Sequence, residues 1–294
     1  MIIVKLTGGL GNQMFQYAAA KALSVSNDTE LKLDISHFNK PVSNETLRYF
    51  RLDIFPNIKE PIADKHEINK LIHQFDFNFF NKLYKNFNKR IFNFNKAYKT
   101  ERGLLYSAIT LNESKSAYLD GYWQTEKYFD KEKIVIHECF SLDYLDQHKA
   151  IQPFIDMMQS EIPVSIHVRR GDYVSNPLTR AYHGTADTDY YKRSIAKITE
   201  TISGNFIFFI FSDDIAWCKK NLIIPFKHVY ISTGTDYYDL HLMSRCRHHI
   251  IANSSFSWWG AWLSKNSDKI IIAPEKWFVG PQSNDIVPVN WLIE

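Results

Sequence analysis

The chain has 294 residues, enough for two domains of ordinary size, and 45% of them are hydrophobic, which supplies a large core. A net charge of +3 argues against bulk binding of nucleic acid, and no apolar run reaches the length of a membrane span. Three widely spaced cysteines predict neither a disulfide framework nor a zinc site, and the absence of an export signal predicts a reducing cytoplasm.

The chain opens with the pattern of an α/β unit. Residues 2–6 form a short apolar run, interpreted as a first strand, and from Met14 onward apolar residues recur at helical spacing. The loop between them contains Gly9, Gly11, Asn12 and Gln13 and offers backbone N–H groups to a phosphate or a closely approaching sugar. A tight turn without a ligand explains the same pattern equally well, because the third glycine of a dinucleotide fingerprint is missing.

Residues 64–100 differ in composition from the rest of the chain, since Phe, Asn and Lys dominate there. The composition favours a helical insertion at about 60–100 in a first domain of residues 1–155. The alternative is a basic, aromatic surface in peripheral contact with the inner face of an anionic membrane. We place the second domain at 156–294 and expect its last residues to pack back on the first domain.

The second half alternates strands and helices. Residues 164–168 read as a strand, and the continuous apolar run 206–211 is typical of a strand buried on both faces. Further strands are expected near 228–231, 249–252 and 269–274, with helices near 190–202, 237–246 and 258–263. This order predicts a parallel sheet with right-handed crossovers.

Arg169 and Arg170 follow the first of these strands directly. Ligands of open α/β sheets bind at the carboxyl ends of strands, and guanidinium forks match phosphate oxygens. The pair therefore predicts a phosphate ligand, most simply a nucleotide, with His167 beside it. Asp172 is interpreted as the partner that orients an arginine in preference to a base.

Two further strand ends carry polar residues. Asp213 follows the buried strand and is placed to accept hydrogen bonds from a guanine edge or a ribose, although a helix cap explains one of the two aspartates at 213 and 214. A second phosphate cradle is predicted at a helix start further on, formed by Asn253, Ser254, Ser255, Phe256 and Ser257. The tryptophans that follow, at 258, 259 and 262, are interpreted as core.

With these stretches in view, the chain resembles the bacterial α-1,2-fucosyltransferases of glycosyltransferase family 11. The matching motifs lie, in family order, at residues 8–18, 121–129, 167–173, 211–214 and 252–260. The resemblance implies a GT-B-like α/β architecture, in which two Rossmann-like domains with parallel sheets face each other across a cleft. The C-terminal domain would then hold GDP-fucose and the N-terminal domain the acceptor sugar.

The resemblance also implies an inverting, metal-independent transfer of L-fucose from GDP-β-L-fucose to the 2-OH of a β-galactoside, as in O-antigen synthesis. By motif position, Arg169 clamps the pyrophosphate, His167 lies beside the nucleotide and Asn12 faces the fucose or the β-phosphate. The loop 182–184 is placed to cover the acceptor. The proton of the attacking hydroxyl goes to a carboxylate, a histidine or water, which leaves four residues open as the base: Asp172, Glu126, Asp120 and His183.

Two other functions fit the same residues. One is a different sugar-nucleotide transferase on this scaffold, because a fold alone does not fix a substrate. The other is a non-catalytic carbohydrate-binding protein with a degenerate nucleotide site. The intact Arg-Arg-Gly-Asp sequence and both loops favour the enzyme, with no metal or other cofactor expected.

Overall fold

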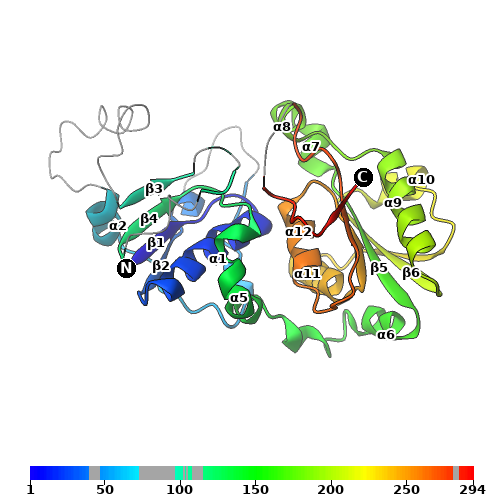
Figure 1. Cartoon of the computed structure of the whole chain (residues 1–294), viewed down its shortest axis with the longest axis horizontal. Helices are drawn as coiled ribbons and strands as arrows, with labels where there is room; N and C mark the ends of the chain where they lie inside the picture. Colours follow the sequence, from blue (N-terminus) through cyan, green and yellow to red (C-terminus); the bar gives the residue numbers. More distant parts are fainter. Residues whose placement is uncertain (40–46, 73–96, 102, 104, 108–114, 281–284) are drawn as a thin grey trace. The chain divides into compact units, whose positions relative to one another are not determined.

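The computed structural model describes residues 1–39, 47–72, 97–101, 103, 105–107, 115–280 and 285–294. They form two compact units, each built on a parallel sheet (Figure 1). The first unit comprises the described parts of 1–53, 57–139 and 284–286, and the second those of 54–56, 140–283 and 287–294. The domain boundary near residue 155 stays a prediction, while the segment from 140 to 155 belongs by its contacts to the second unit.

The first unit has a four-stranded sheet in the order β2-β1-β4-β3, with every pair parallel. Its strands are β1 (Ile2–Lys5), β2 (Leu31–Asp34), β3 (Tyr98–Thr100) and β4 (Ala117–Asp120). Ile2, Ile3 and Val4 are fully buried, which confirms the predicted first strand. The remaining elements are α1 (Leu10–Ser26), α2 (Lys65–Ile72), α5 (Lys133–Cys139) and the short 3₁₀ helices η1 (Ser36–Asn39), η2 (Leu52–Ile54), η3 (Glu126–Tyr128) and η4 (Asp130–Glu132).

The Phe, Asn and Lys runs of the predicted insertion lie outside the described residues, at 73–96. The described flanks of that segment are α2, which contacts β4, and the edge strand β3. Both interpretations of the segment therefore stay predictions. Within the described ranges, no helix is both long enough and apolar enough to cross a bilayer.

The second unit has a six-stranded parallel sheet in the order β10-β9-β8-β5-β6-β7. Its strands are β5 (Ile162–Val168), β6 (Phe206–Ser212), β7 (Lys227–Ile231), β8 (His248–Ile250), β9 (Ile271–Ala273) and β10 (Leu292–Ile293). The chain starts in the middle of the sheet, runs outward to β7 and then returns to the other side of β5. This is the doubly wound Rossmann order, and its direction reverses between β5 and β8.

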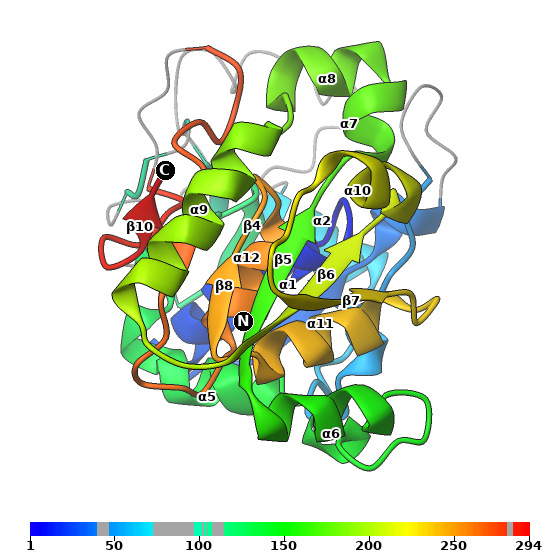
Figure 2. The ribbon, with the colours of Figure 1, turned by 90° about the vertical axis from the view of Figure 1, so that its right-hand side faces the viewer.

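Helices cover both faces of this second sheet. Figures 1 and 2 show α9 (Thr188–Thr201) and α10 (Ile215–Asn221) on one face, and α11 (Asp236–Arg245) and α12 (Ser255–Trp262) on the other. Three shorter helices complete the unit, namely α6 (Gln152–Ser160), α7 (Gly171–Ser175) and α8 (Pro177–His183). The predicted strand 206–211 is confirmed, because each of its residues is buried. Four elements of this unit were not predicted: α6, α7, α8 and the exposed two-residue strand β10. Tyr182 and His183 of the predicted loop 182–184 are the last two residues of α8.

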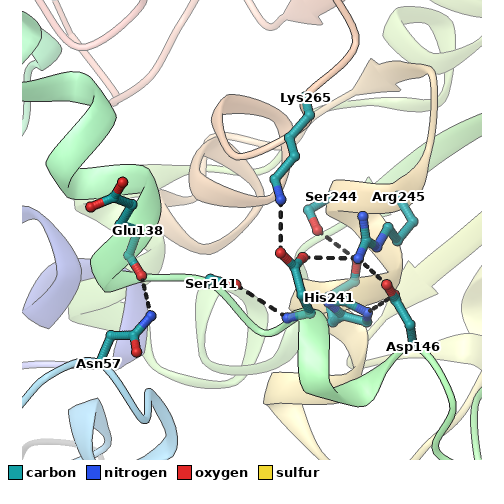
Figure 3. Close-up of polar contacts among 9 residues, drawn as sticks. Asn57, Glu138, Ser141, Asp146, His241, Ser244, Arg245 and Lys265 are labelled. Carbon is teal, nitrogen blue, oxygen red and sulfur yellow. Dashed lines mark hydrogen bonds and ion pairs between the residues drawn. The ribbon is translucent and has the colours of Figure 1, made fainter.

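A network of charged side chains ties the start of the second unit to its helices (Figure 3). Asp143 begins the 3₁₀ helix η5 (Asp143–Leu145), and its carboxylate accepts from Arg245 at 2.9 Å and from Lys265 at 2.8 Å. Arg245 also pairs with Asp146, whose other oxygen lies 2.8 Å from Nε2 of His241. The hydrogen bond from Lys265 is the main reason why the pKa of Asp143 lies below its usual range. The segment that follows Cys139 is thereby fixed to α11.

We predict that Arg245→Ala lowers the free energy of unfolding by about 1–2 kcal/mol, because one guanidinium serves two half-exposed carboxylates. Arg247→Ala is the matched control, since Arg247 lies 3.9 Å from the exposed Asp268 and its loss should cost less than about 0.5 kcal/mol. Urea denaturation of both variants measures the difference. Equal unfolding midpoints would show that the network contributes nothing.

Candidate active site

The register of β5 and β6 places two arginines beside two aspartates. His167 pairs with Phe211 and Val168 with Ser212, so the residues after each strand leave the sheet side by side. The edge reached is the carboxyl edge, and β5 is the strand next to the topological reversal. Ligands of doubly wound sheets bind at this place, so the structure puts the Arg-Arg motif where the sequence predicted it.

The Arg169 guanidinium is paired with Asp213. Its Nη1 lies 2.7 Å from Oδ2 of Asp213, and both side chains are about a quarter exposed. The other oxygen of Asp213 accepts the backbone N–H of Arg170 at 2.8 Å. The guanidinium also lies over the ring of Tyr173, 5.4 Å from its centroid. Arg169 is therefore held at the strand end while part of its surface reaches solvent.

Arg170 is held differently. Its guanidinium stacks on the Trp217 ring at 4.0 Å, and Nε lies 3.4 Å from Oδ2 of Asp214. Asp214 also caps α10 by accepting the N–H of Trp217 at 3.0 Å, which confirms a helix cap for one of the two aspartates. These contacts turn Arg170 toward α10, so the two neighbouring arginines have different surroundings.

His167 is a buried, neutral histidine. Burial, and then the nearby Arg169 charge, lowers its pKa from 6.5 to about 3. Its Nδ1 has no hydrogen-bond partner among the described residues, and its ring lies 5.8 Å from that of Phe256. The imidazole next to Arg169 is thus neutral, and its predicted contact with a nucleotide stays a prediction.

Gly171 leaves room for the ion pair. A Cβ there would lie 2.5 Å from Oδ2 of Asp213, the oxygen that Arg169 contacts. A side chain at this position would push the carboxylate away from the guanidinium. Asp172 follows in α7, and its side chain lies outside the described part of the structure, so both roles suggested for it stay predictions.

The polar loop after β8 is mostly buried. Asn253 donates from Nδ2 to the backbone oxygens of His183, at 2.8 Å, and Trp277, at 3.2 Å, while its Oδ1 is buried without a partner among the described atoms. Its own backbone oxygen accepts from the Tyr173 hydroxyl at 3.2 Å. Asn253 thus joins the strand end to the segment that carries Arg169.

The serines of that loop begin α12. Ser254 and Ser257 are buried, and the Ser257 hydroxyl donates to the backbone oxygens of Ala252 and Ser254. Ser255 and Phe256 are the partly exposed residues of the group. The tryptophans that follow are buried, as predicted, at positions 258, 259 and 262.

The glycine loop of the first unit is shorter than predicted, because α1 already begins at Leu10. Gly8 has a φ of +75° and Gly9 is the N-cap, so Gly11, Asn12 and Gln13 lie in the first helical turn. Gln13 is fully buried, and its amide bonds to the backbone of Gly8, Tyr49 and Arg51. Its contacts therefore brace the loop, while a binding role for it stays a prediction.

Two residues near this loop were not singled out from the sequence. The amide of Gln124 donates to Oδ1 of Asn12 at 2.8 Å, although the two are 112 positions apart. Arg48 approaches the loop closely enough that a Cβ at Gly9 would lie 3.8 Å from its Nη1. The sequence indicated Gln124 only as part of the Gly-Tyr-Trp-Gln motif at 121–124. Arg48 lies in none of the motifs.

The residues left open as the base have distinct surroundings. Asp120 accepts from Lys5 at 3.2 Å and from the Tyr98 hydroxyl at 2.7 Å. The His183 ring stacks on Tyr173 with centroids 4.6 Å apart. Asp120 is thus already engaged within its sheet, whereas His183 lies in contact with the ring under Arg169. Glu126, the first residue of η3, completes the described candidates.

Comparisons with known proteins agree on one family. The family described as Glycosyl transferase family 11 matches residues 1–294. An alpha-1,2-colitosyltransferase from Escherichia coli is 37% identical and covers 99% of this chain and 98% of its own. The O-antigen biosynthesis glycosyltransferase WbnK, also from E. coli, is 31% identical over 98% of both chains. A mouse galactoside 2-alpha-L-fucosyltransferase, Sec1, is 30% identical over 37% of this chain and 30% of its own.

Solved structures share the fold at low sequence identity. NodZ alpha-1,6-fucosyltransferase, co-crystallised with GDP, is 12% identical and superposes with a TM-score of 0.50, covering 88% of this chain and 91% of its own. The match, together with the two parallel sheets, confirms the GT-B-like fold class predicted from the sequence.

The pKa of His167 gives a pH-dependent prediction. The unfolded chain binds a proton at this histidine near its ordinary pKa of 6.5, whereas the folded chain does so only near 3, so acidification favours unfolding. Between about pH 7 and about pH 5, wild type should lose about 2 kcal/mol more unfolding free energy than His167→Gln. Chemical denaturation at both pH values measures this; parallel losses would mean that folding does not lower the pKa of His167.

Proposed function

The chain belongs to glycosyl transferase family 11, and we propose that it transfers a 6-deoxy-L-sugar from a GDP-linked donor to the 2-OH of a galactoside. The product is an α-1,2 linkage in an O-antigen type of glycan. The activities for which the relatives are named support the linkage and the setting, and a protein of the same fold was crystallised with GDP.

The observation that carries the proposal is the Arg169–Asp213 pair at the carboxyl ends of β5 and β6, where β5 is the strand next to the reversal of the second sheet. Asp213 holds the guanidinium at the strand end, and about a quarter of the Arg169 side chain stays exposed on the edge where ligands of such sheets bind. In the proposed reaction the acceptor O2 attacks C1 of the sugar, its proton passes to a carboxylate, a histidine or water, and the bond from C1 to the diphosphate oxygen breaks. The electron pair stays on that oxygen, and Arg169 offsets the charge.

The same arrangement supports transfer without a metal ion, which is part of the proposal. A guanidinium remains charged at any working pH and offers fixed donors to the departing diphosphate. His167 adds a neutral hydrogen-bonding group without a second charge. Inversion at C1 follows from attack on the face opposite the departing diphosphate.

Fucose and colitose are the two candidate sugars. Fucose follows from the motifs, whereas colitose is favoured by the relative that is 37% identical over nearly the whole chain. Colitose lacks the 3-hydroxyl of fucose. A site that bonds this hydroxyl rejects the sugar without it by about two orders of magnitude or more, so a comparison of kcat/KM for the two GDP-sugars identifies the donor.

We predict GDP release and an α-1,2-linked product from one of these donors with a β-galactoside acceptor, unchanged by EDTA. Arg169→Ala should lower kcat/KM by about 10²-fold or more while the fold is retained, because it removes the main donor to the leaving group. Product linkage is read by NMR spectroscopy and turnover by GDP release.

Arg193→Ala is the control, because Arg193 is an exposed arginine of α9 that lies 3.5 Å from Glu294, and it should keep full activity. Loss of turnover in EDTA would refute the metal-independent reaction. Binding of galactosides without turnover of either donor would instead indicate a carbohydrate-binding protein.

A further inference from the structure

The turn after β4 contains a strained residue. Trp123 has a φ of +55°, a conformation that costs a bulky residue on the order of 1–2 kcal/mol, and its side chain is fully buried. Such a conformation persists only where the surroundings determine it. Strained backbone of this kind gathers at functional sites, so the contacts that hold Trp123 are informative.

The Glu101 carboxylate holds the turn through two hydrogen bonds from its backbone. Its Oε2 accepts the backbone N–H groups of Tyr122 and Trp123, each at 2.9 Å. Gly121 permits this approach, since a Cβ there would lie 2.7 Å from Cβ of Glu101 and 3.0 Å from the Trp123 ring. That ring packs edge-on against Tyr128 with centroids 5.3 Å apart. The turn is therefore fixed by one carboxylate and one aromatic contact.

Gln124 follows in a backbone that is fixed on both sides. The N–H of Thr125 donates to the backbone oxygen of Trp123 at 2.9 Å, which makes a γ-turn centred on Gln124. The Thr125 hydroxyl then accepts the N–H of Lys127 and caps η3. The side chain of Gln124 consequently starts from a defined place, and its Nε2 donates to Oδ1 of Asn12 at 2.8 Å.

This hydrogen bond sets the polarity of the Asn12 amide. Because Oδ1 accepts from Gln124, the Nδ2 end is directed to Gly8, where a Cβ would lie 2.7 Å from it. The φ of +75° at Gly8 keeps this position for glycine. The N–H end of Asn12 thus lies at the glycine loop, at the carboxyl edge of the first sheet.

We propose that Gln124 is a positioning residue, which directs the N–H end of Asn12 toward the glycine loop and is itself held by the Glu101–Trp123 turn. The inference rests on the proposed function in one respect, namely that Asn12 meets the donor sugar or its phosphate. An N–H donor stabilises negative charge that develops on a leaving diphosphate, whereas a carbonyl oxygen in its place repels that charge. The orientation of one amide therefore affects the reaction rate.

Gln124→Glu tests the polarity. At about pH 8 the new carboxylate only accepts, so the Asn12 amide turns over and kcat/KM falls by about tenfold or more. As the pH drops toward about 4, below the ordinary Glu pKa of about 4.3, the protonated fraction of the introduced carboxyl group donates again, and the activity relative to wild type recovers. Gln124→Met, which only loses the bond, should fall by about threefold at every pH.

The pH profile separates positioning from packing. Glu has nearly the shape of Gln, so a packing role predicts wild-type activity for Gln124→Glu and a loss for Gln124→Met alone. That order would overturn the proposal, as would a loss in Gln124→Glu that does not recover at low pH. If Gln124→Glu fails to fold, Gln124→Met with unchanged kcat/KM overturns it.

A measurement without turnover distinguishes this inference from the proposed function. The side-chain amide signal of Asn12, assigned by its absence in Asn12→Asp, should shift in the ¹⁵N–¹H spectrum of Gln124→Glu and return on acidification. If wild type uses neither GDP-sugar, the proposed function fails while this spectrum still decides the orientation. An Asn12 signal that does not respond to Gln124→Glu overturns the inference.

Discussion

The second unit depends on the parallel pairing of β5 with β6 in one register. This pairing ends at Val168 and Ser212, so Arg169 and Asp213 leave the sheet next to each other. A shift by one residue would move the guanidinium out of line with that carboxylate. The register runs over seven paired positions, from Ile162 with Phe206 to Val168 with Ser212. The pairing of two strands thus determines the position of a charge at the sheet edge.

The positive charge at this strand end belongs to a guanidinium, a group that stays charged at any working pH. Burial, and then the nearby Arg169 charge, lowers the pKa of His167 to about 3 and keeps its ring neutral. The neighbouring Arg170 is stacked on Trp217 and paired with Asp214, whereas Arg169 is paired with Asp213. The two consecutive arginines are therefore held by different partners.

Glycines admit polar groups to close positions at three places in the structure. Gly171 admits the Asp213 carboxylate, Gly121 admits Glu101, and Gly8 admits the Asn12 amide. In each case a Cβ would lie within 2.7 Å of a side-chain atom. The motifs of the sequence therefore contain glycine for close approach as well as for backbone conformation.

The strands of the second unit and the polar residues at their ends could be predicted from the sequence, because both patterns involve residues that are close together in the chain. The apolar run 206–211 predicted a doubly buried strand, and the residues after it predicted a helix cap. The stacking of Arg170 on Trp217 could not be predicted, since it joins positions 47 apart that only the sheet brings together. The complete burial of the polar Gln13 side chain could not be predicted either. It depends on hydrogen bonds to backbone groups that lie 36 and 38 positions away in the sequence.

The most direct measurement is a crystal structure of the protein with GDP bound. The account predicts diphosphate oxygens within hydrogen-bonding distance of the Arg169 guanidinium, at the carboxyl end of β5. GDP bound elsewhere, with Arg169 still paired only to Asp213, would contradict it.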